Sequence, residues 1–300
     1  MKIQSVLIIT VLITLVVSLM CISLFPSVQD FMNYNTTWNG VRHSLNALNA
    51  DAVDSVQNLP APINNSILIT IPYMQYNNSD LEDLKTFVNN GGTLMVMDDY
   101  GFGNSILEYL NVDCRFSGAV LLDPFFCYKN QLFPEITDFS PSISKDVKLV
   151  VMNHATALIN VAKSDVAAWS SSSSFLDTND NGTLNKGELQ GPLPVAARLN
   201  FGGGTIILVS DPSLIINSML GRDNNLLFVT QLIGPKAQTG YVFVDTSHVV
   251  KLPMDITKAK FATFKQILSQ PYLLVGIVFI IFMFTSIYVL RTGGAIGRKS

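Results

Sequence analysis

The stretch Ile67-Leu68-Ile69-Thr70-Ile71-Pro72, the segment 79–88 and the run Thr93-Leu94-Met95-Val96-Met97 predict the fold of this chain. The first and third are short apolar runs, which is typical of buried strands. The segment between them has apolar residues at helical spacing, and it begins with Ser79 as N-cap and Glu82 as its capping-box partner. A strand, a helix and a second strand in this order predict a parallel sheet with right-handed crossovers.

Working outward, the same alternation continues on both sides of this unit. A helix is expected around residues 104–110, and an earlier one around 38–48. Strands are expected at 194–199 and 205–210, and a helix from about Asp223 to Ile233 completes the domain. The fold class is therefore α/β, with a mainly parallel sheet flanked by helices. Residues 114–155, which are rich in β-branched and aromatic residues, predict a β-rich insertion.

Apolar runs stand near both ends of the chain. Residues 3–25 and 272–290 are uncharged and about as long as a helix that crosses a bilayer. Lys2 precedes the first run and the tail 291–300 is basic, so both termini are expected in the cytoplasm. A domain at 34–234 is then expected outside a cell membrane, with the lipid bilayer as a partner.

Alternatives to two membrane anchors follow from the same runs. Residues 3–25 can also be a cleavable signal peptide, although Ser23-Leu24-Phe25-Pro26 is a poor cleavage site. Residues 272–290 can also be a buried core helix. The juxtamembrane segment 235–270 mixes basic and apolar residues, which suits either an amphipathic helix or a connecting stalk.

Net charge and cysteine content bear on whether the chain binds nucleic acid or zinc and whether it forms a disulfide. The formal net charge is -3 although the tail is basic, so the central part is acidic and nucleic-acid binding is disfavoured. Cys114 and Cys127 can form a disulfide in an oxidising exterior or remain as free thiols, and both readings stay open. No Cys-x-x-Cys pair is present, which disfavours a cysteine zinc site.

The segment 177–188 matches the twelve-residue calcium loop of helix-loop-helix proteins. Gly182 occupies the sixth position, where the loop turns sharply. A surface turn rich in Asn and Gly is the alternative. Calcium would be structural here, because a metal wrapped by protein oxygens has no open position for a substrate. The expected ligands are Asp177, Asn179, Asn181, Thr183, Asn185 and Glu188.

Polar residues also follow two of the expected strands, at the carboxyl edge where α/β sheets bind ligands. Three roles are open for these polar residues: they can bind a ligand, the aspartates among them can be the catalytic groups of a hydrolase, or they can cap helices. No Gly-x-Ser-x-Gly motif is present, and His43, His154 and His248 are scattered, which favours a non-enzymatic role. The candidates are Asp98, Asp99, Gly101, Gly103, Asn104, Asp211, Ser213 and Asn217.

With these residues in view, the chain resembles an uncharacterised family of membrane-anchored proteins whose outer domain is similar to class I glutamine amidotransferases. The resemblance rests on 84–94, on Asp98-Asp99 with 103–107, and on 204–213. It implies a flavodoxin-like or amidotransferase-like fold. The turn after Met97 has no Cys, so the resemblance implies a fold retained for binding rather than for glutaminase activity. It also implies a link with a MoxR-type ATPase and its partners.

These observations predict a membrane-anchored, non-catalytic extracytoplasmic protein that binds or scaffolds a partner in an envelope assembly or transport system. An extracytoplasmic hydrolase that uses the sheet-edge aspartates is the alternative.

Overall fold

The computed structural model describes residues 3–24, 27–59, 63–234 and 240–268, together with Phe279, Phe282, Met283 and Ser286. The chain divides into two compact units. One comprises Met1–Phe25 with Leu252–Ser300, and the other is Pro26–Lys251. Each unit is described by itself.

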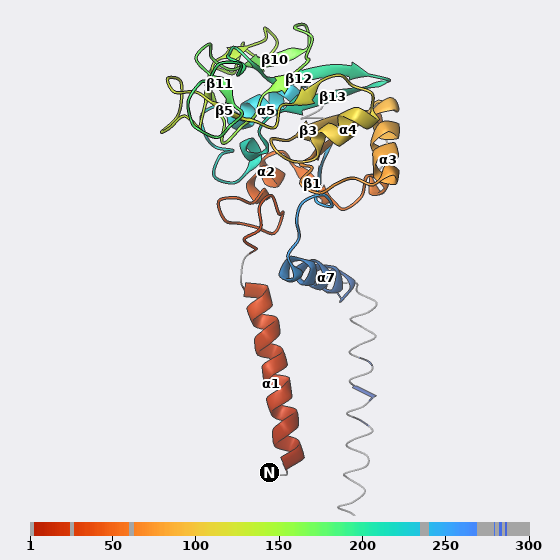
Figure 1. Ribbon diagram of the computed structural model, residues 1–300. Helices are drawn as coiled ribbons and strands as arrows, with labels where there is room; N and C mark the ends of the chain where they lie inside the picture. Colours follow the sequence, from red (N-terminus) through yellow and green to blue (C-terminus); the bar gives the residue numbers. More distant parts are fainter. Residues whose placement is uncertain are drawn as a thin grey trace, which may run out of the picture. The chain divides into compact units, whose positions relative to one another are not determined.

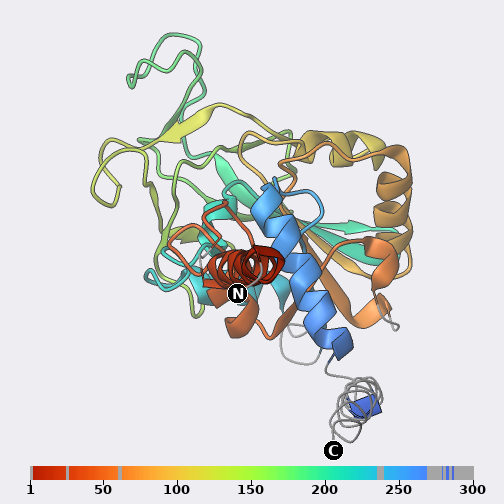
Figure 2. The ribbon, with the colours of Figure 1, turned by 90° about the horizontal axis from the view of Figure 1, so that it is seen from below.

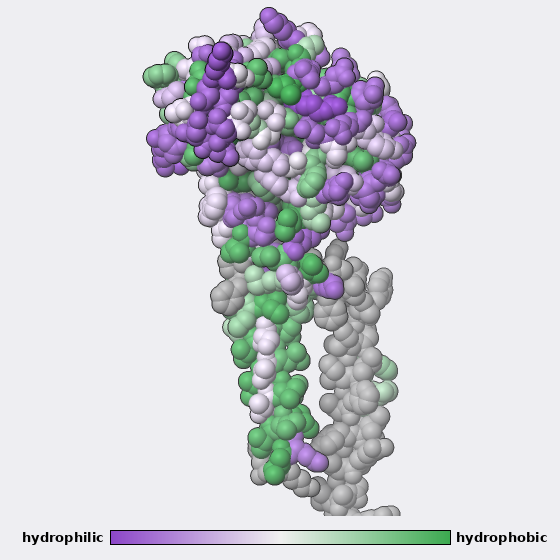
Figure 3. All heavy atoms as spheres, in the orientation of Figure 1, coloured by the Kyte–Doolittle hydropathy of each residue, from purple (hydrophilic) through white to green (hydrophobic). Residues whose placement is uncertain are grey.

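The smaller unit contains α1 (Ile3–Leu24) and α7 (Pro253–Leu268). Hydrophobic residues cover most of α1 (Figure 3). In the part of the chain that the structure describes, no helix is long and apolar enough to cross a membrane. The predicted architecture of a domain between two membrane-spanning helices is therefore wrong, as is the membrane localisation with both termini in the cytoplasm. The prediction counted apolar residues in a run, which by itself does not establish a span. The second run, 272–290, lies almost wholly outside the described residues.

An eight-stranded sheet forms the centre of the larger unit (Figures 1 and 2). The five strands at one side of the sheet run parallel, and the remaining three pair antiparallel. In spatial order the strands are β1 (Ala50–Val53), β14 (Tyr241–Asp245), β2 (Ser66–Thr70), β3 (Thr93–Met97), β13 (Gly204–Val209), β12 (Pro194–Phe201), β10 (Val166–Trp169) and β7 (Asp138–Phe139).

The sheet is thus mixed: the prediction of parallel strands holds only for one side of the sheet, and the prediction of a flavodoxin-like sheet is wrong. The difference arises at β12 and β13, which are joined directly by Gly202 and Gly203. A turn of two residues connects antiparallel strands only, because a parallel connection needs a crossover of a dozen or more residues.

Helices cover both faces of the sheet. One face packs α3 (Asn78–Asn89) and α4 (Gly103–Tyr109), and the other packs α2 (Arg42–Ala47) and α5 (Asn225–Ile233). The described residues also contain single turns of 3₁₀-helix: η1 (Val56–Asn58), η2 (Ile63–Asn65) and η3 (Pro212–Ile215).

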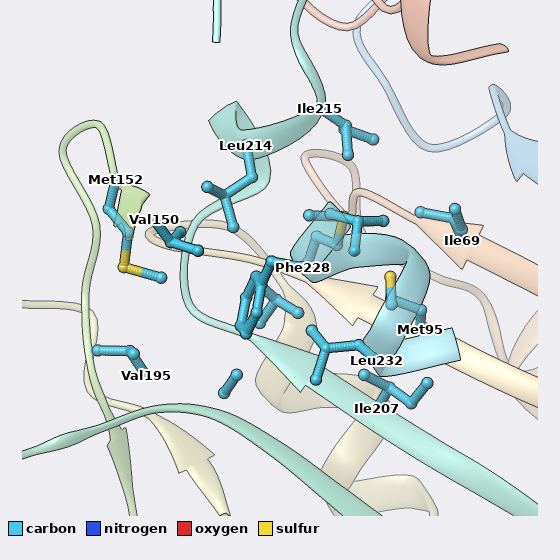
Figure 4. Close-up of a cluster of buried hydrophobic side chains, with 14 of the residues drawn as sticks. Ile69, Met95, Val150, Met152, Val195, Ile207, Leu214, Ile215, Phe228 and Leu232 are labelled. Atoms are coloured by element: carbon cyan, nitrogen blue, oxygen red, sulfur yellow. The ribbon is translucent and has the colours of Figure 1, made fainter. Parts of the chain in front are cut away.

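Alternate residues of each central strand enter two separate cores, as a pleated strand requires. In β3, for example, Met95 contributes to the core under α5, whereas Leu94 and Val96 contribute to the core under α3 and α4. Figure 4 shows Phe228 of α5 at the centre of the first core, among side chains that include Met95. Because the central strands are buried on both faces, their packing fixes the position of the backbone that carries the polar groups at their carboxyl ends.

Three pairs of short strands lie between residues 114 and 177, and Figure 1 shows one pair, β5 (Val120–Leu122) with β11 (Phe175–Asp177), on the side of the unit away from α3. Cys114 is buried and Cys127 half-buried in this region, and both are free thiols. The other two pairs are β4 (Arg115–Phe116) with β9 (Leu158–Ile159), and β6 (Glu135–Ile136) with β8 (Val150–Val151).

Candidate functional site

The strands β2, β3 and β13 are neighbours in register, so their carboxyl ends meet at one edge. Tyr73 follows β2, Asp98 and Asp99 follow β3, and Asp211 follows β13. This is the edge where open α/β sheets bind their ligands. The three aspartates are all buried.

The Asp98 side chain stabilises the turn that follows it. Its carboxylate accepts hydrogen bonds from the N–H groups of Asp99 (3.0 Å), Gly101 (2.8 Å) and Gly103 (2.7 Å). Burial raises the pKa of Asp98 to about 6, although these N–H groups lower it. A carboxylate of the protein therefore takes the N–H groups that a phosphate would need, so this turn is not a phosphate cradle. Asn104 exchanges two hydrogen bonds with the backbone of Phe116 and is equally structural.

Asp211 and Asn217 also hold backbone in place. Asp211 accepts hydrogen bonds from the N–H groups of Ser213 and Asn153, each at 2.7 Å. Burial, together with the smaller effect of the nearby Asp99 carboxylate, raises the pKa of Asp211 to about 8, against the effect of these N–H groups. The side chain of Asn217 ties a distant loop to this edge, because it donates to the carbonyls of Asn35 (3.1 Å) and Thr37 (2.6 Å).

Asp99 differs, because its partner reaches a cavity. Its Oδ1 accepts hydrogen bonds from the Tyr73 hydroxyl at 2.7 Å and from the N–H of Tyr100 at 2.6 Å. Burial raises the pKa of Asp99, and the bond from Tyr73 opposes that shift. Burial and the Asp99 carboxylate together raise the pKa of the Tyr73 phenol, which therefore stays protonated.

A cavity of about 200 Å³ opens above Tyr73, and we call it the Tyr73 pocket. Two further cavities adjoin it. One, of about 210 Å³, shares Asp30, Phe31 and Tyr73, and the other, of about 490 Å³, shares His154. The Tyr73 pocket is lined by Asp30, Phe31, Trp38, Asn39, Tyr73, Asn153, His154, Ser213 and Ile216.

Of the sequence-predicted edge residues, only Ser213 lines the Tyr73 pocket, and the other seven lie outside its lining. Sequence reasoning missed Tyr73, Trp38 and His154. The position of Tyr73 directly after a strand was a usable signal, the same one that selected Asp98. A larger cavity of about 590 Å³ lies beside β10 and the end of α5, and its lining contains none of these edge residues.

Two residues of the Tyr73 pocket have unusual backbone conformations. Phe31 has φ +57° and His154 has φ +55°, in the left-handed region that bulky side chains rarely adopt. Such conformations persist only where the surroundings hold them, and they cluster at ligand sites. Among the other histidines, His248 packs on Tyr76 and bonds Asp245 in a buried cluster, which supports a structural role there.

The calcium-type loop begins at the end of β11 and closes on itself. Asp177 accepts hydrogen bonds from the N–H groups of Asn179, Asn181 and Gly182, and Gly182 makes its turn at φ +74°. Glu188 reaches back to the N–H groups of Thr178 and Asn185. Among the described residues, no group of three or more His, Cys, Asp or Glu side chains is placed to hold a metal.

The other expected ligands in this loop bond to one another. Asn181 Oδ1 accepts from the N–H and hydroxyl of Thr183 and from the Asn185 amide. Asn179 contributes its backbone N–H, which donates to Asp177 Oδ1. One wall of the 490 Å³ cavity is formed by Asp177, Thr178 and Asp180, so the loop borders the cavities at the sheet edge.

Comparison with solved structures shows weak likenesses of fold. The mmIFT52 N-terminal domain is 17% identical, with a TM-score of 0.43, over 57% of this chain and 77% of that domain. The β-galactosidase from Bacillus circulans sp. alkalophilus is 14% identical, with a TM-score of 0.32, over 53% of this chain and 22% of the enzyme. The cytoplasmic protein STM3548 from Salmonella typhimurium is 15% identical, with a TM-score of 0.31, over 59% of this chain and 76% of that protein.

No curated protein matches this chain in sequence. A family model does match, and its residues 33–233 include β2, β3 and β13 together with most of the Tyr73 pocket. The model describes a domain of unknown function, DUF4350, and the match covers more than half of the chain. The chain therefore belongs to the DUF4350 family.

Proposed function

We propose that the Pro26–Lys251 unit is a non-catalytic module that binds a ligand in the Tyr73 pocket. The observation that supports this proposal is that the polar residues at the sheet edge bind the protein's own backbone, whereas other residues there line a cavity. Asp98, Asp211 and Asn217 are committed to backbone groups, whereas Trp38 and His154 line a cavity. A concave site with aromatic walls and a few polar groups is the usual form of a small-molecule site.

The hydrolase alternative has less support. An aspartate that acts as general acid or base must lie within hydrogen-bond reach of the substrate. Asp98 and Asp211 are buried, bonded to main-chain N–H groups and absent from the lining of the Tyr73 pocket. The backbone of residues 98–103 has no positive φ, so it lacks the strained turn of a nucleophile elbow.

The two tryptophans of the chain provide a direct test. Trp38 lines the Tyr73 pocket, and Trp169 lies in β10, outside the lining of that pocket. We expect the fragments of a chemically diverse library that bind the protein to shift the indole N–H resonance of Trp38 and leave that of Trp169 in place. A library in which no member shifts Trp38, or in which binders shift only Trp169, would contradict the proposal.

We also propose that residues 177–188 bind a structural calcium ion. The spacing of oxygen-bearing side chains and the left-handed turn at Gly182 support it. Asp177, Asn179, Asn181 and Glu188 would hold the ion with their side chains, and Thr183 with its carbonyl. The ion would fix a long loop that forms a wall of the neighbouring cavity.

A further inference from the structure

We propose that the Tyr73 pocket binds a small organic cation with an alkylammonium head group, held by the rings of Phe31, Trp38 and Tyr73 and by the carboxylate of Asp30. This inference rests on the proposed function, because it names the chemical class of ligand for the same pocket.

Three aromatic side chains supply the first argument. Phe31 and Tyr73 both line the cavity, and their rings stack with centroids 5.2 Å apart and planes 21° apart. Trp38 lines the same cavity and leaves 65% of its surface exposed, although a Trp is normally buried. Aromatic faces carry negative charge density, and several of them around one space attract quaternary and alkylated ammonium groups.

Charge supplies the second argument. Asp30 lines the pocket, and the amide of Asn39 donates to its Oδ1. No hydrogen bond to Asp30 Oδ2 is found among the described residues. The Asp99 carboxylate lies next to the Tyr73 ring, because its Oδ1 accepts the hydrogen bond from the Tyr73 hydroxyl at 2.7 Å. None of the described residues that line the Tyr73 pocket or its two neighbours is Lys or Arg. The pocket therefore repels anions and stabilises a cation.

Size and rigidity supply the third argument. The cavity of about 200 Å³ is smaller than the roughly 300–1,000 Å³ of sites for drug-sized ligands, which suits a compact head group. The loop that carries Trp38 is locked from both sides. Asn35 donates to Asn39 within the loop, and Asn217 donates to the carbonyls of Asn35 and Thr37 from the other side. A pocket that is already ordered loses little entropy when it binds.

One glycine shows how closely this loop is packed. A Cβ added at Gly40 would stand 2.0 Å from the carbonyl oxygen of Asn35, so only glycine fits there. The backbone of Phe31 is held to the same loop, because its N–H donates to the carbonyl of Asn39 at 2.9 Å. Asp30, Phe31 and Trp38 are thus fixed together before any ligand arrives.

The inference is tested on the full chain with choline and with its uncharged carbon isostere, 3,3-dimethyl-1-butanol, called dimethylbutanol below. They share shape and hydroxyl group and differ in charge, so their affinities measure the contribution of the positive charge. Titration is followed by the Trp38 indole N–H resonance, with Trp169 as the internal reference. We expect choline to bind at least about tenfold more tightly than dimethylbutanol.

Asp30→Asn is the matched variant, because the Asn oxygen can still accept from Asn39 while the charge is lost. We expect it to weaken choline by about tenfold and to leave dimethylbutanol unchanged. Equal affinities for the two probes, or an unchanged choline affinity in Asp30→Asn, would overturn the inference.

The two proposals fail separately. If library fragments shift Trp38 but choline and tetramethylammonium do not, the cation inference is wrong and the ligand-binding proposal stands. If no compound of any charge shifts Trp38, both are wrong. A variant spectrum with dispersed resonances like those of the parent protein shows that Asp30→Asn still folds.

Discussion

The hydroxyl of Tyr73 donates a 2.7 Å hydrogen bond to Oδ1 of Asp99. Tyr73 therefore has two roles, because the residue lines a cavity while its hydroxyl stabilises a buried carboxylate. The packing of the protein interior and the properties of the pocket are therefore coupled at a single side chain.

Tyr73→Phe separates these two roles. The ring remains and the hydrogen bond is lost, so we expect the free energy of unfolding to fall by about 1–3 kcal/mol. The bond favours the ionised form of Asp99, so the loss should be larger at pH 8 than at pH 5. Urea denaturation at both pH values measures it. In the matched variant Tyr100→Phe, which removes a hydroxyl bonded to the His154 carbonyl, the loss should not grow with pH. A loss in Tyr73→Phe that is equal at both pH values would contradict this reading.

Asp211 should make the protein less stable as pH rises. Burial raises its folded-state pKa to about 8, above its ordinary value of 3.8, so the folded protein holds a proton that the unfolded chain releases. Stability from this group is fully present below pH 3.8 and is lost as pH rises to about 8, by up to about 1.4 kcal/mol per pH unit. Denaturation between pH 5 and pH 8 measures the slope. Asp211→Asn, which has no carboxyl proton to lose, should flatten that slope, and an unchanged slope would show that another group causes it.

Millimolar calcium should raise the melting temperature of the full chain. With two carboxylates among the expected ligands, Asp177 and Glu188, a Kd of the order of 10⁻⁴ to 10⁻³ M is expected. The hydrogen bonds from Thr178 and Asn185 lower the pKa of Glu188, so its carboxylate is ionised at neutral pH. Glu188→Gln should abolish the calcium shift. The control Glu108→Gln, on the exposed surface of α4, should keep it, and magnesium should not reproduce it. A parent protein whose melting temperature ignores calcium would refute the site.

Asn217→Ala should release the loop that carries Trp38. The substitution leaves the carbonyls of Asn35 and Thr37 and the N–H of His43 without this partner. We expect a loss of about 2–4 kcal/mol in the free energy of unfolding, because partly buried polar groups lose their hydrogen bonds. The Trp38 indole resonance should also move toward its position in unfolded protein. Asn200→Ala, at an exposed position of β12, should change neither quantity. A Trp38 resonance that stays in place would mean that other contacts hold the loop.

Local patterns predicted the local elements well. The apolar run at 67–72 and the helical spacing at 79–88 correspond to β2 and α3. The helix begins earlier than expected, at Asn78, because the side chain of Asn77 and not that of Ser79 accepts the capping hydrogen bond from Asp80. Both residue types cap helices well, so composition alone does not choose between them.

Contacts between residues far apart in the sequence could not be predicted from these local patterns. The strand ends located Asp98 and Asp211 at the carboxyl edge, but the Tyr73 pocket is lined in part by Asp30, Phe31 and Trp38. Those residues come from the start of the unit and reach the edge through hydrogen bonds to Asn217, some 180 residues later in the chain. No local periodicity encodes such a contact. Strand direction was likewise misjudged, since it depends on which strands pair rather than on the pattern of each strand.

The position of β14 has a practical consequence for anyone who expresses part of this protein. Residues 33–233 are those that match the family model, yet β14 (Tyr241–Asp245) lies beyond them and pairs with both β1 and β2 inside the sheet. A fragment trimmed to the family boundaries would lack an internal strand and would leave two unpaired strand edges, which are sites of aggregation. It would also lack Asp30 and Phe31, so a well-behaved fragment should run from about residue 26 to residue 251.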